Sequence, residues 1–200
     1  MRARDNPFRS ECLLQIRYRL RDTTWPHLLA RLERLHFRAA LVGPHGSGKT
    51  TLLEELQSRL RERGFGTLCI RLDDEQRSFE KGFLDSLFGG LTDNDIILFD
   101  GAEQMSPLVW WRFQRRSRRA GGLIITSHRP GRLPTLLECR TTADLLAGIA
   151  SQLLGEDLEQ VQSKAEILYR KYRGNLREAL REWYDDGAYA REFSPQRGRS

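Results

Sequence analysis

Short apolar runs alternate with stretches of helical periodicity through the first three quarters of the chain. The apolar runs are the length of buried strands and are predicted at residues 37–42, 66–72, 95–99, 122–126 and 136–139. Apolar residues recur at helical spacing in Lys49–Arg63, near Ser78–Phe88 and in Met105–Arg119. Strands that alternate with helices predict an α/β fold with a five-stranded, mainly parallel sheet between helices.

The pattern changes after residue 141, where three stretches of helical periodicity follow one another. They cover residues 143–154, 158–172 and 176–184, with Gly155 and Gly174 as breaks, and they predict a small helical bundle. The tail at 194–200 is polar and is expected to be disordered. The predicted division is an N-terminal extension and helix (1–36), an α/β core (37–141), a helical lid (142–193) and the tail (194–200).

A chain of 200 residues with 39% hydrophobic composition can bury one substantial core and a small annex. No apolar run approaches the roughly 20 residues of a spanning helix, and the opening residues lack a secretory signal, so a cytoplasmic protein is expected. Cys12, Cys69 and Cys139 are odd in number and far apart, which argues against a disulfide framework or a zinc site. They are expected to be reduced, with Cys69 and Cys139 in core strands.

The formal charge of +6 leaves direct nucleic-acid binding open, because phosphate contacts draw on basic residues. Most basic residues are arginines, however, and they alternate with acidic residues along helix faces. One cluster differs: Arg115, Arg116, Arg118 and Arg119 follow two tryptophans. This cluster could grip a nucleic-acid backbone or supply an arginine to a neighbouring subunit's phosphate. In the alternative interpretation, Trp and Phe pack inward and the arginines extend from the helix end.

The segment Gly43-Pro-His-Gly-Ser-Gly-Lys-Thr50 follows the first predicted strand directly. It matches G-x-x-x-x-G-K-[ST] in full, with the strand and the helix that this motif requires on either side. Glycines let successive N–H groups turn toward phosphate oxygens, and the helix N-terminus adds positive potential. The predicted nucleotide-binding residues are Gly43, Pro44, His45, Gly46, Ser47, Gly48, Lys49, Thr50 and Thr51.

Three of these residues have more specific expected roles. Lys49 is expected to reach the β- and γ-phosphates, Thr50 to ligate Mg²⁺ and Thr51 to contact the α-phosphate. The second metal residue is Asp100, because it ends the apolar run at 95–99 and P-loop proteins hold a magnesium-organising carboxylate at such a strand end. A helix N-cap is the alternative role for Asp100. The expected ligands are ATP, or GTP as the alternative nucleotide, with Mg²⁺.

The phosphate loop and the Asp100 strand resemble the additional-strand P-loop ATPases, especially AAA+ and the related origin-recognition-type and STAND ATPases. The resemblance runs from about Asn6 to Tyr184, is specific only in those two motifs, and includes the opening Asn6-Pro-Phe8. In that class a strand intervenes between the phosphate-loop strand and the acidic strand, and Gly66–Leu72 fits this place.

The resemblance also implies catalytic and sensor residues. Many members carry a catalytic Glu directly after the magnesium Asp, but this chain has Gly101 there, so Glu103 is the candidate for polarising water, against a carboxylate that merely complements a helix dipole. Ser127 or His128 lies where the γ-phosphate sensor is expected. Arg177 matches the sensor arginine of the lid, against a solvated arginine beside acidic neighbours.

The expected function is a magnesium-dependent ATPase, slow or partner-stimulated, that acts as a nucleotide-driven switch on a macromolecular partner, most simply a protein, with oligomerisation open. A P-loop kinase that transfers the γ-phosphate to a small acceptor is one alternative. A nucleotide-binding regulatory module without turnover is another.

Overall fold

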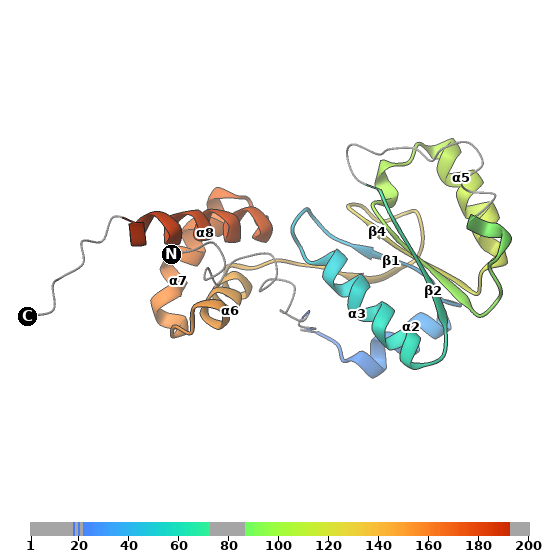
Figure 1. Ribbon diagram of the computed structural model, residues 1–200, viewed down its shortest axis with the longest axis horizontal. Coiled ribbons are helices and arrows are strands. Elements are labelled where there is room, and N and C mark those ends of the chain that lie inside the picture. The colour runs from blue at the N-terminus through green and yellow to red at the C-terminus, as the bar shows by residue number, and fades with distance from the viewer. Residues whose placement is uncertain (1–17, 19, 21, 73–86, 193–200) are drawn as a thin grey trace, which may run out of the picture. The chain divides into compact units, whose positions relative to one another are not determined.

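The computed structural model describes Tyr18, Leu20, residues 22–72 and residues 87–192, with side chains up to residue 186 (Figure 1). The strands are β1 (Arg38–Val42), β2 (Gly66–Arg71), β3 (Asp95–Asp100), β4 (Gly122–Ser127) and β5 (Thr135–Glu138). The α-helices are α2 (Trp25–Arg34), α3 (Lys49–Glu62), α5 (Pro107–Arg116), α6 (Ala143–Leu154), α7 (Leu158–Lys171) and α8 (Leu176–Glu192), and the 3₁₀ helices are η2 (Ala102–Gln104) and η3 (Ser117–Arg119).

The five strands form one parallel sheet in the order β2-β3-β4-β1-β5. The predicted α/β fold with five strands is therefore confirmed. The strand that separates the phosphate-loop strand β1 from the acidic strand β3 is β4, so the assignment of Gly66–Leu72 to this place is wrong for the sheet. That segment forms the edge strand β2, because strand order depends on long-range pairing and not on order along the chain.

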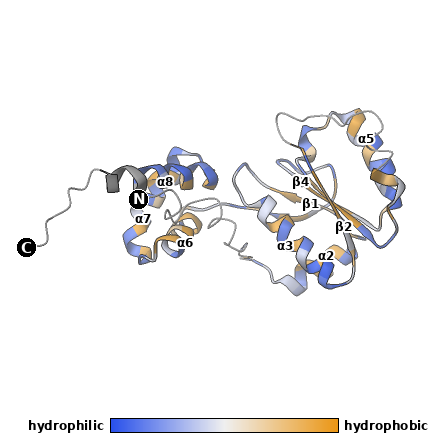
Figure 2. Ribbon diagram, in the orientation of Figure 1, coloured by the Kyte–Doolittle hydropathy of each residue, from blue (hydrophilic) through white to orange (hydrophobic). Residues whose placement is uncertain are grey.

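Two hydrophobic layers cover the two faces of the sheet. In Figure 1, α2 and α3 lie on one face and α5 on the other. The α3 layer includes the buried Leu52, Leu56 and Leu60, and the α5 layer includes Phe99 and Phe113. Figure 2 shows the strands as the hydrophobic centre between these helices. Burial on both faces explains why the central strands read as continuous apolar runs.

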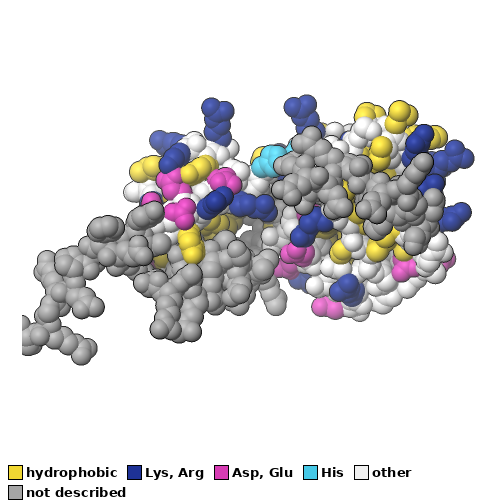
Figure 3. All heavy atoms as spheres, turned by 45° about the horizontal axis from the view of Figure 1, so that its top comes forward, with side chains coloured by type: hydrophobic (Ala, Val, Ile, Leu, Met, Phe, Trp, Pro, Cys, Tyr) yellow, Lys and Arg dark blue, Asp and Glu magenta, His cyan; other side chains and the backbone are white. Residues whose placement is uncertain are grey.

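Helix α5 begins at a capped N-terminus and keeps one face exposed. The Ser106 hydroxyl accepts a hydrogen bond from the Val109 N–H, and Pro107 occupies the first turn. Trp110 and Phe113 pack inward, as the alternative interpretation of this segment expects, but Trp111 is exposed. In Figure 3, hydrophobic and basic side chains lie side by side at the end of the molecule where α5 is seen.

The chain forms two compact units. The sheet unit contains Tyr18–Gly43 and Gly48–Cys139, while Pro44–Ser47 and residues 140–192 belong to the helical unit. In the helical unit, α6, α7 and α8 pack around a core that includes Leu146, Val161 and Trp183. The breaks fall where expected, because Gly155 and Gly174 both have positive φ angles at helix ends.

The structure differs from the sequence-based predictions at the end of α8 and at Cys69. Helix α8 extends beyond the predicted end at Tyr184. The placement of Cys69 in the core is wrong, because edge strand β2 leaves it exposed, whereas Cys139 is buried. Both thiols are free.

Among the described helices, none is long and apolar enough to cross a membrane. The opening Asn6-Pro-Phe8, the tail and most of the helix expected near Ser78–Phe88 lie outside the described residues.

Candidate functional site

The phosphate loop connects β1 to α3 at the carboxyl edge of the sheet. The Gly43 N–H donates to the carbonyl of Ser127 at 3.1 Å, which ties the start of the loop to the end of β4. Gly46 and Gly48 have φ angles of 69° and 81°, a conformation that other residues adopt at a cost. Helix α3 begins at Lys49, so its first N–H groups remain available to an anion.

Two side chains inside this loop are buried and polar. The Lys49 ammonium donates to the Gly43 carbonyl at 2.8 Å, and Lys49 is only 8% exposed. The Ser47 hydroxyl is buried and has no hydrogen-bond partner among the described residues. Buried polar groups are nearly always satisfied, so an unsatisfied hydroxyl beside a buried cation fits a loop that closes around an oxygen-rich ligand.

Asp100 is held by hydroxyl groups from two different elements. Thr50 donates to Oδ2 at 2.8 Å, and Thr126 on β4 donates to Oδ1 at 2.6 Å. The Thr126 hydroxyl also accepts the Gly101 N–H at 3.0 Å, so its orientation is fixed. Hydroxyl and carboxylate oxygens are the donor set that Mg²⁺ prefers. Thr50 and Asp100 therefore fit a magnesium site, and Thr126 positions the carboxylate.

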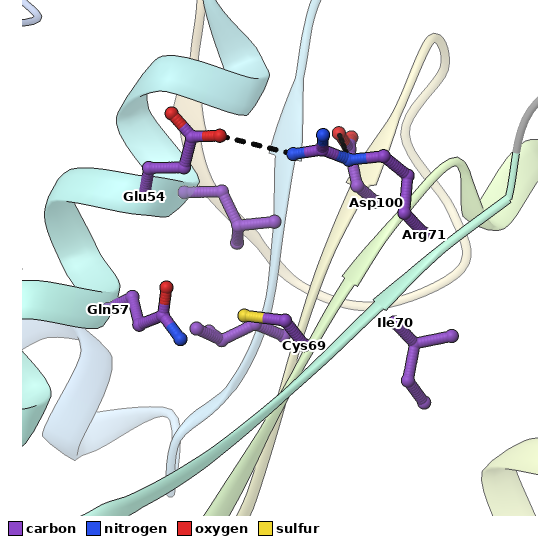
Figure 4. A pocket seen from close by; sticks show the side chains of 8 residues that line it. Glu54, Gln57, Cys69, Ile70, Arg71 and Asp100 are labelled. Carbon is purple, nitrogen blue, oxygen red and sulfur yellow. Dashed lines mark hydrogen bonds and ion pairs between the residues drawn. The ribbon is translucent and has the colours of Figure 1, made fainter.

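A cation from the edge strand also contacts Asp100. Arg71 is paired with Asp100 in the β2–β3 register, and its Nε lies 3.5 Å from Asp100 Oδ2 while its Nη2 lies 3.1 Å from Glu54 Oε1. Figure 4 shows Arg71 between the two carboxylates. Because the Arg71 side chain is 63% exposed, its attraction to Asp100 is screened by water.

A cavity of about 180 Å³ lies beside this ion pair, between α3 and β2. Its lining residues are Leu53, Glu54, Gln57, Cys69, Ile70, Arg71, Leu98 and Asp100 (Figure 4). Partial burial raises the pKa of the Cys69 thiol, with opposing effects from Arg61 and Arg71.

The residue after Asp100 is a glycine for a steric reason. Gly101 has a φ angle of 88°, and a β-carbon at this position would lie 2.4 Å from the Leu72 carbonyl oxygen. A glutamate directly after Asp100 would require this backbone to shift. The glutamate of the AAA+ pattern is thus absent at a position where Gly101, directly after β3, lies against Leu72, directly after β2.

Glu103 and His128 form a pair on the same side of the sheet unit. Glu103 lies in η2, and its Oε1 is 3.1 Å from His128 Nε2. Its other oxygen, Oε2, is buried without a hydrogen-bond partner among the described residues. Ser127 is engaged locally, because its hydroxyl donates to the Arg129 carbonyl and accepts the Arg129 N–H. Glu103 Oε2 is thus a buried acceptor that is left unsatisfied among the described residues.

The remaining predicted site residues are Pro44, His45, Thr51 and Arg177. Pro44 and His45 are exposed in the loop, and Thr51 is half-buried in the first turn of α3. Arg177 is exposed in the first turn of α8. Glu182, one of its acidic neighbours along the chain, is bound by Lys171 and Tyr172. Their predicted contacts with nucleotide remain predictions.

Sequence reasoning missed Arg71 and Thr126 as members of this site. Thr126 carried a signal, because a hydroxyl residue interrupts the aliphatic run of a central strand, and such buried hydroxyls need a partner. Arg71 carried a weaker one, a basic residue at the carboxyl end of a strand. Its pairing with Asp100 depends on the β2–β3 register, which the sequence alone does not specify.

Solved structures with a similar fold include three variants of RuvB from Thermotoga maritima. Their TM-scores are 0.51, 0.52 and 0.51 at sequence identities of 20%, 22% and 17%, over 78–79% of this chain. The chain spans only 58–60% of the length of those RuvB chains. No protein-family model and no curated protein matches the sequence. The chain therefore shares the α/β fold of these RuvB structures, and the likeness assigns no family.

Proposed function

We propose that the protein binds ATP with Mg²⁺ at the phosphate loop and hydrolyses it slowly, as a nucleotide-driven switch on a macromolecular partner. The observation that carries this proposal is the hydrogen bond from Thr50 to Asp100 at 2.8 Å. It joins the loop motif to a carboxylate that is 50 positions away in the sequence. A glycine turn with no ligand would not require a buried lysine, an unsatisfied serine and a carboxylate at the same edge.

The binding step follows from the loop itself. The N–H groups at the start of α3 would donate to phosphate oxygens, and the helix dipole favours negative charge there. Lys49 exchanges its bond to the Gly43 carbonyl for the β- and γ-phosphate oxygens. The Ser47 hydroxyl gains the partner that it lacks. The Lys49 exchange replaces a neutral carbonyl acceptor with an anionic oxygen, and the Ser47 exchange supplies a missing hydrogen bond.

The metal residues act as a positioned pair. Bound Mg²⁺ would neutralise charge that develops on the phosphate oxygens and orient them for in-line attack. Thr50 supplies one oxygen, and Asp100 supplies a carboxylate that Thr126 holds in a fixed orientation. Thr126 also accepts the Gly101 N–H, so the hydroxyl that bonds the carboxylate is itself held in place.

Glu103 is the proposed acceptor for the attacking water. Its Oε1 is held by His128, which leaves the buried Oε2 to accept a hydrogen bond from water. In this proposal His128 positions Glu103, and Ser127 or His128 responds to the γ-phosphate. Arg177 remains the proposed sensor of the helical unit. Hydrolysis is slow because the carboxylate is not in the position directly after Asp100 that AAA+ ATPases use.

A second candidate is a regulatory module that binds nucleotide without turnover. It is favoured by two features: Gly101 replaces the usual glutamate, and Arg71 places positive charge beside Asp100. The two candidates predict the same binding and different chemistry. No contact among the described residues favours a kinase over either.

The test is a measurement of ATP and GTP binding and of phosphate release, each with Mg²⁺ and with EDTA. The ATPase proposal expects saturable ATP binding and phosphate release that requires Mg²⁺, together with limited-proteolysis patterns that differ between ATP and ADP. Binding with no phosphate release would support the regulatory module. Release that rises only when a small hydroxyl acceptor is added, with transfer of ³²P to that acceptor, would indicate a kinase. Absence of nucleotide binding would contradict all three.

A further inference from the structure

One long segment of the sheet unit contains basic residues and no acidic ones. Between Glu103 and Glu138 there are seven arginines and no aspartate or glutamate. Five of these arginines lie on or directly after α5, at positions 112, 115, 116, 118 and 119. Elsewhere in the chain arginines alternate with carboxylates, as in the Arg63–Glu33 and Arg71–Glu54 pairs. This concentration of one sign of charge is the electrostatic footprint of a polyanion site.

The arginines share their helix face with exposed apolar side chains. Leu108 is 71% exposed and Trp111 is 55% exposed. Leu108, Trp111 and Arg115 follow one another at spacings of three and four, so they form a single stripe along α5. The Arg115 guanidinium lies 5.8 Å from the centre of the Trp111 ring. An exposed indole beside a guanidinium offers a surface on which a flat ring can stack, with a cation next to it.

The opposite side of α5 and the end of η3 are anchored to the sheet. The neighbouring Trp110 and Phe113 are buried against the sheet. Arg38 on β1 donates to the carbonyls of Ser117 and Ala120 at 2.7 and 3.2 Å, which anchors the end of the helix and η3. Burial and the positive charge of Arg118 both lower the pKa of Arg38, so the cations are close enough to repel one another. An anionic partner would relieve that repulsion.

We propose that the exposed face of α5 and η3, formed by Leu108, Trp111, Arg112, Arg115, Arg118 and Arg119, binds single-stranded nucleic acid. The arginines meet the phosphates, and a base stacks on Trp111. Single strands fit better than duplexes, because only unpaired bases present a flat face to an exposed indole. Acidic proteins would match the charge but would not use the indole in this way. The surface is separate from the phosphate loop, so the inference does not depend on ATP hydrolysis.

The test uses the full chain without nucleotide and a fluorescently labelled oligothymidylate, with anisotropy recorded over a range of salt concentrations. The double variant Arg112→Ala, Arg115→Ala should bind more weakly, and its log Kd against log salt should flatten by about 1.4, since each phosphate contact on a single strand contributes about 0.7. The matched control is Arg34→Ala, Arg181→Ala, which removes two exposed helical arginines from α2 and α8. It should retain the wild-type affinity and slope.

Stacking is tested separately at Trp111. Trp111→Ala should weaken binding at least about fivefold at every salt concentration, and Trp111→Phe should restore most of the loss, because stacking does not depend on the indole N–H. Thermal unfolding by circular dichroism should be unchanged in all these variants, since the side chains are exposed. ATP affinity should also be unchanged.

Three results would overturn the proposal. One is equal oligonucleotide binding by the α5 double variant and its control. Another is equal or tighter binding of a duplex of the same length. The third is full retention of affinity in Trp111→Ala, which would reduce the surface to general attraction of polyanions.

Discussion

Thr50, in the first turn of α3, donates a hydrogen bond of 2.8 Å to Asp100 at the end of β3. Thr50 follows the loop after β1, and Asp100 ends β3, but β1 and β3 are not neighbours because β4 lies between them. The parallel arrangement aligns the carboxyl ends of all three strands, so the loop after β1 and the last residue of β3 meet above β4. Thr126 on β4 completes the arrangement by bonding the other oxygen of Asp100.

Replacing Lys49 with Ala should abolish ATP binding and leave the fold intact. The variant loses the cation expected on the β- and γ-phosphates and one internal bond to the Gly43 carbonyl. Isothermal titration with ATP and Mg²⁺ measures the affinity, and circular dichroism checks the fold. Lys164→Ala is the matched control, since Lys164 lies on α7 and pairs with Asp186. Unchanged affinity in Lys49→Ala would remove the phosphate-loop assignment.

Replacing Glu103 with Gln should keep ATP affinity near wild type and slow hydrolysis by roughly 10²–10⁴, the contribution of a positioned general base. Gln preserves the shape of the Glu103 side chain but is a weaker hydrogen-bond acceptor for water. Phosphate release under single-turnover conditions measures the step, and Glu159→Gln on α7 serves as the control. Equal hydrolysis rates in Glu103→Gln and wild type would show that Glu103 only pairs with His128.

Arg71→Ala should lower the Mg²⁺ concentration required for ATP binding, because Arg71 places positive charge 3.5 Å from an Asp100 oxygen. The pair is exposed, so the change should be less than about fivefold in the half-saturating Mg²⁺ concentration. Arg63→Ala is the control, since Arg63 pairs with Glu33 and not with Asp100. A higher Mg²⁺ requirement in Arg71→Ala would mean that Arg71 supports metal binding and does not oppose it.

Gly101→Ala should destabilise the protein by more than Gly64→Ala. The two glycines have nearly the same φ angle, 88° and 86°, so a side chain is strained equally at both. Only Gly101 has a close neighbour, the Leu72 carbonyl oxygen, whereas nothing lies within 4 Å of a β-carbon at position 64. Gly64→Ala should cost about 1 kcal/mol and Gly101→Ala about 2–3 kcal/mol in urea unfolding. Equal losses would show that the backbone at Gly101 relaxes.

The strands were predictable because burial on both faces makes them continuously apolar. Strand β4, whose six residues are all buried, is the clearest example. The position of β4 between β1 and β3 was not predictable, since pairing partners are chosen by long-range packing. The exposure of Cys69 has the same cause: an apolar run does not reveal whether its strand lies at the centre or at the edge.

The site was predictable where a motif fixes geometry along the chain. The spacing of Gly43, Lys49 and Thr50 requires a loop before a helix, and the structure has one. Contacts between separate elements could not be predicted from the sequence in this way. The Glu103–His128 and Arg71–Asp100 pairs each join segments whose distance depends on the sheet order, and no local pattern encodes them.

The most direct measurement is ATP affinity of wild type and Asp100→Asn, each with excess Mg²⁺ and with EDTA. The central claim assigns Asp100 to magnesium, so Asp100→Asn should lose most of the difference between the two conditions. Its affinity in EDTA should stay close to that of wild type. Asn preserves the shape and can still accept the Thr126 hydroxyl, so a structural role would be largely retained. An equal loss of affinity with and without Mg²⁺ would contradict the claim.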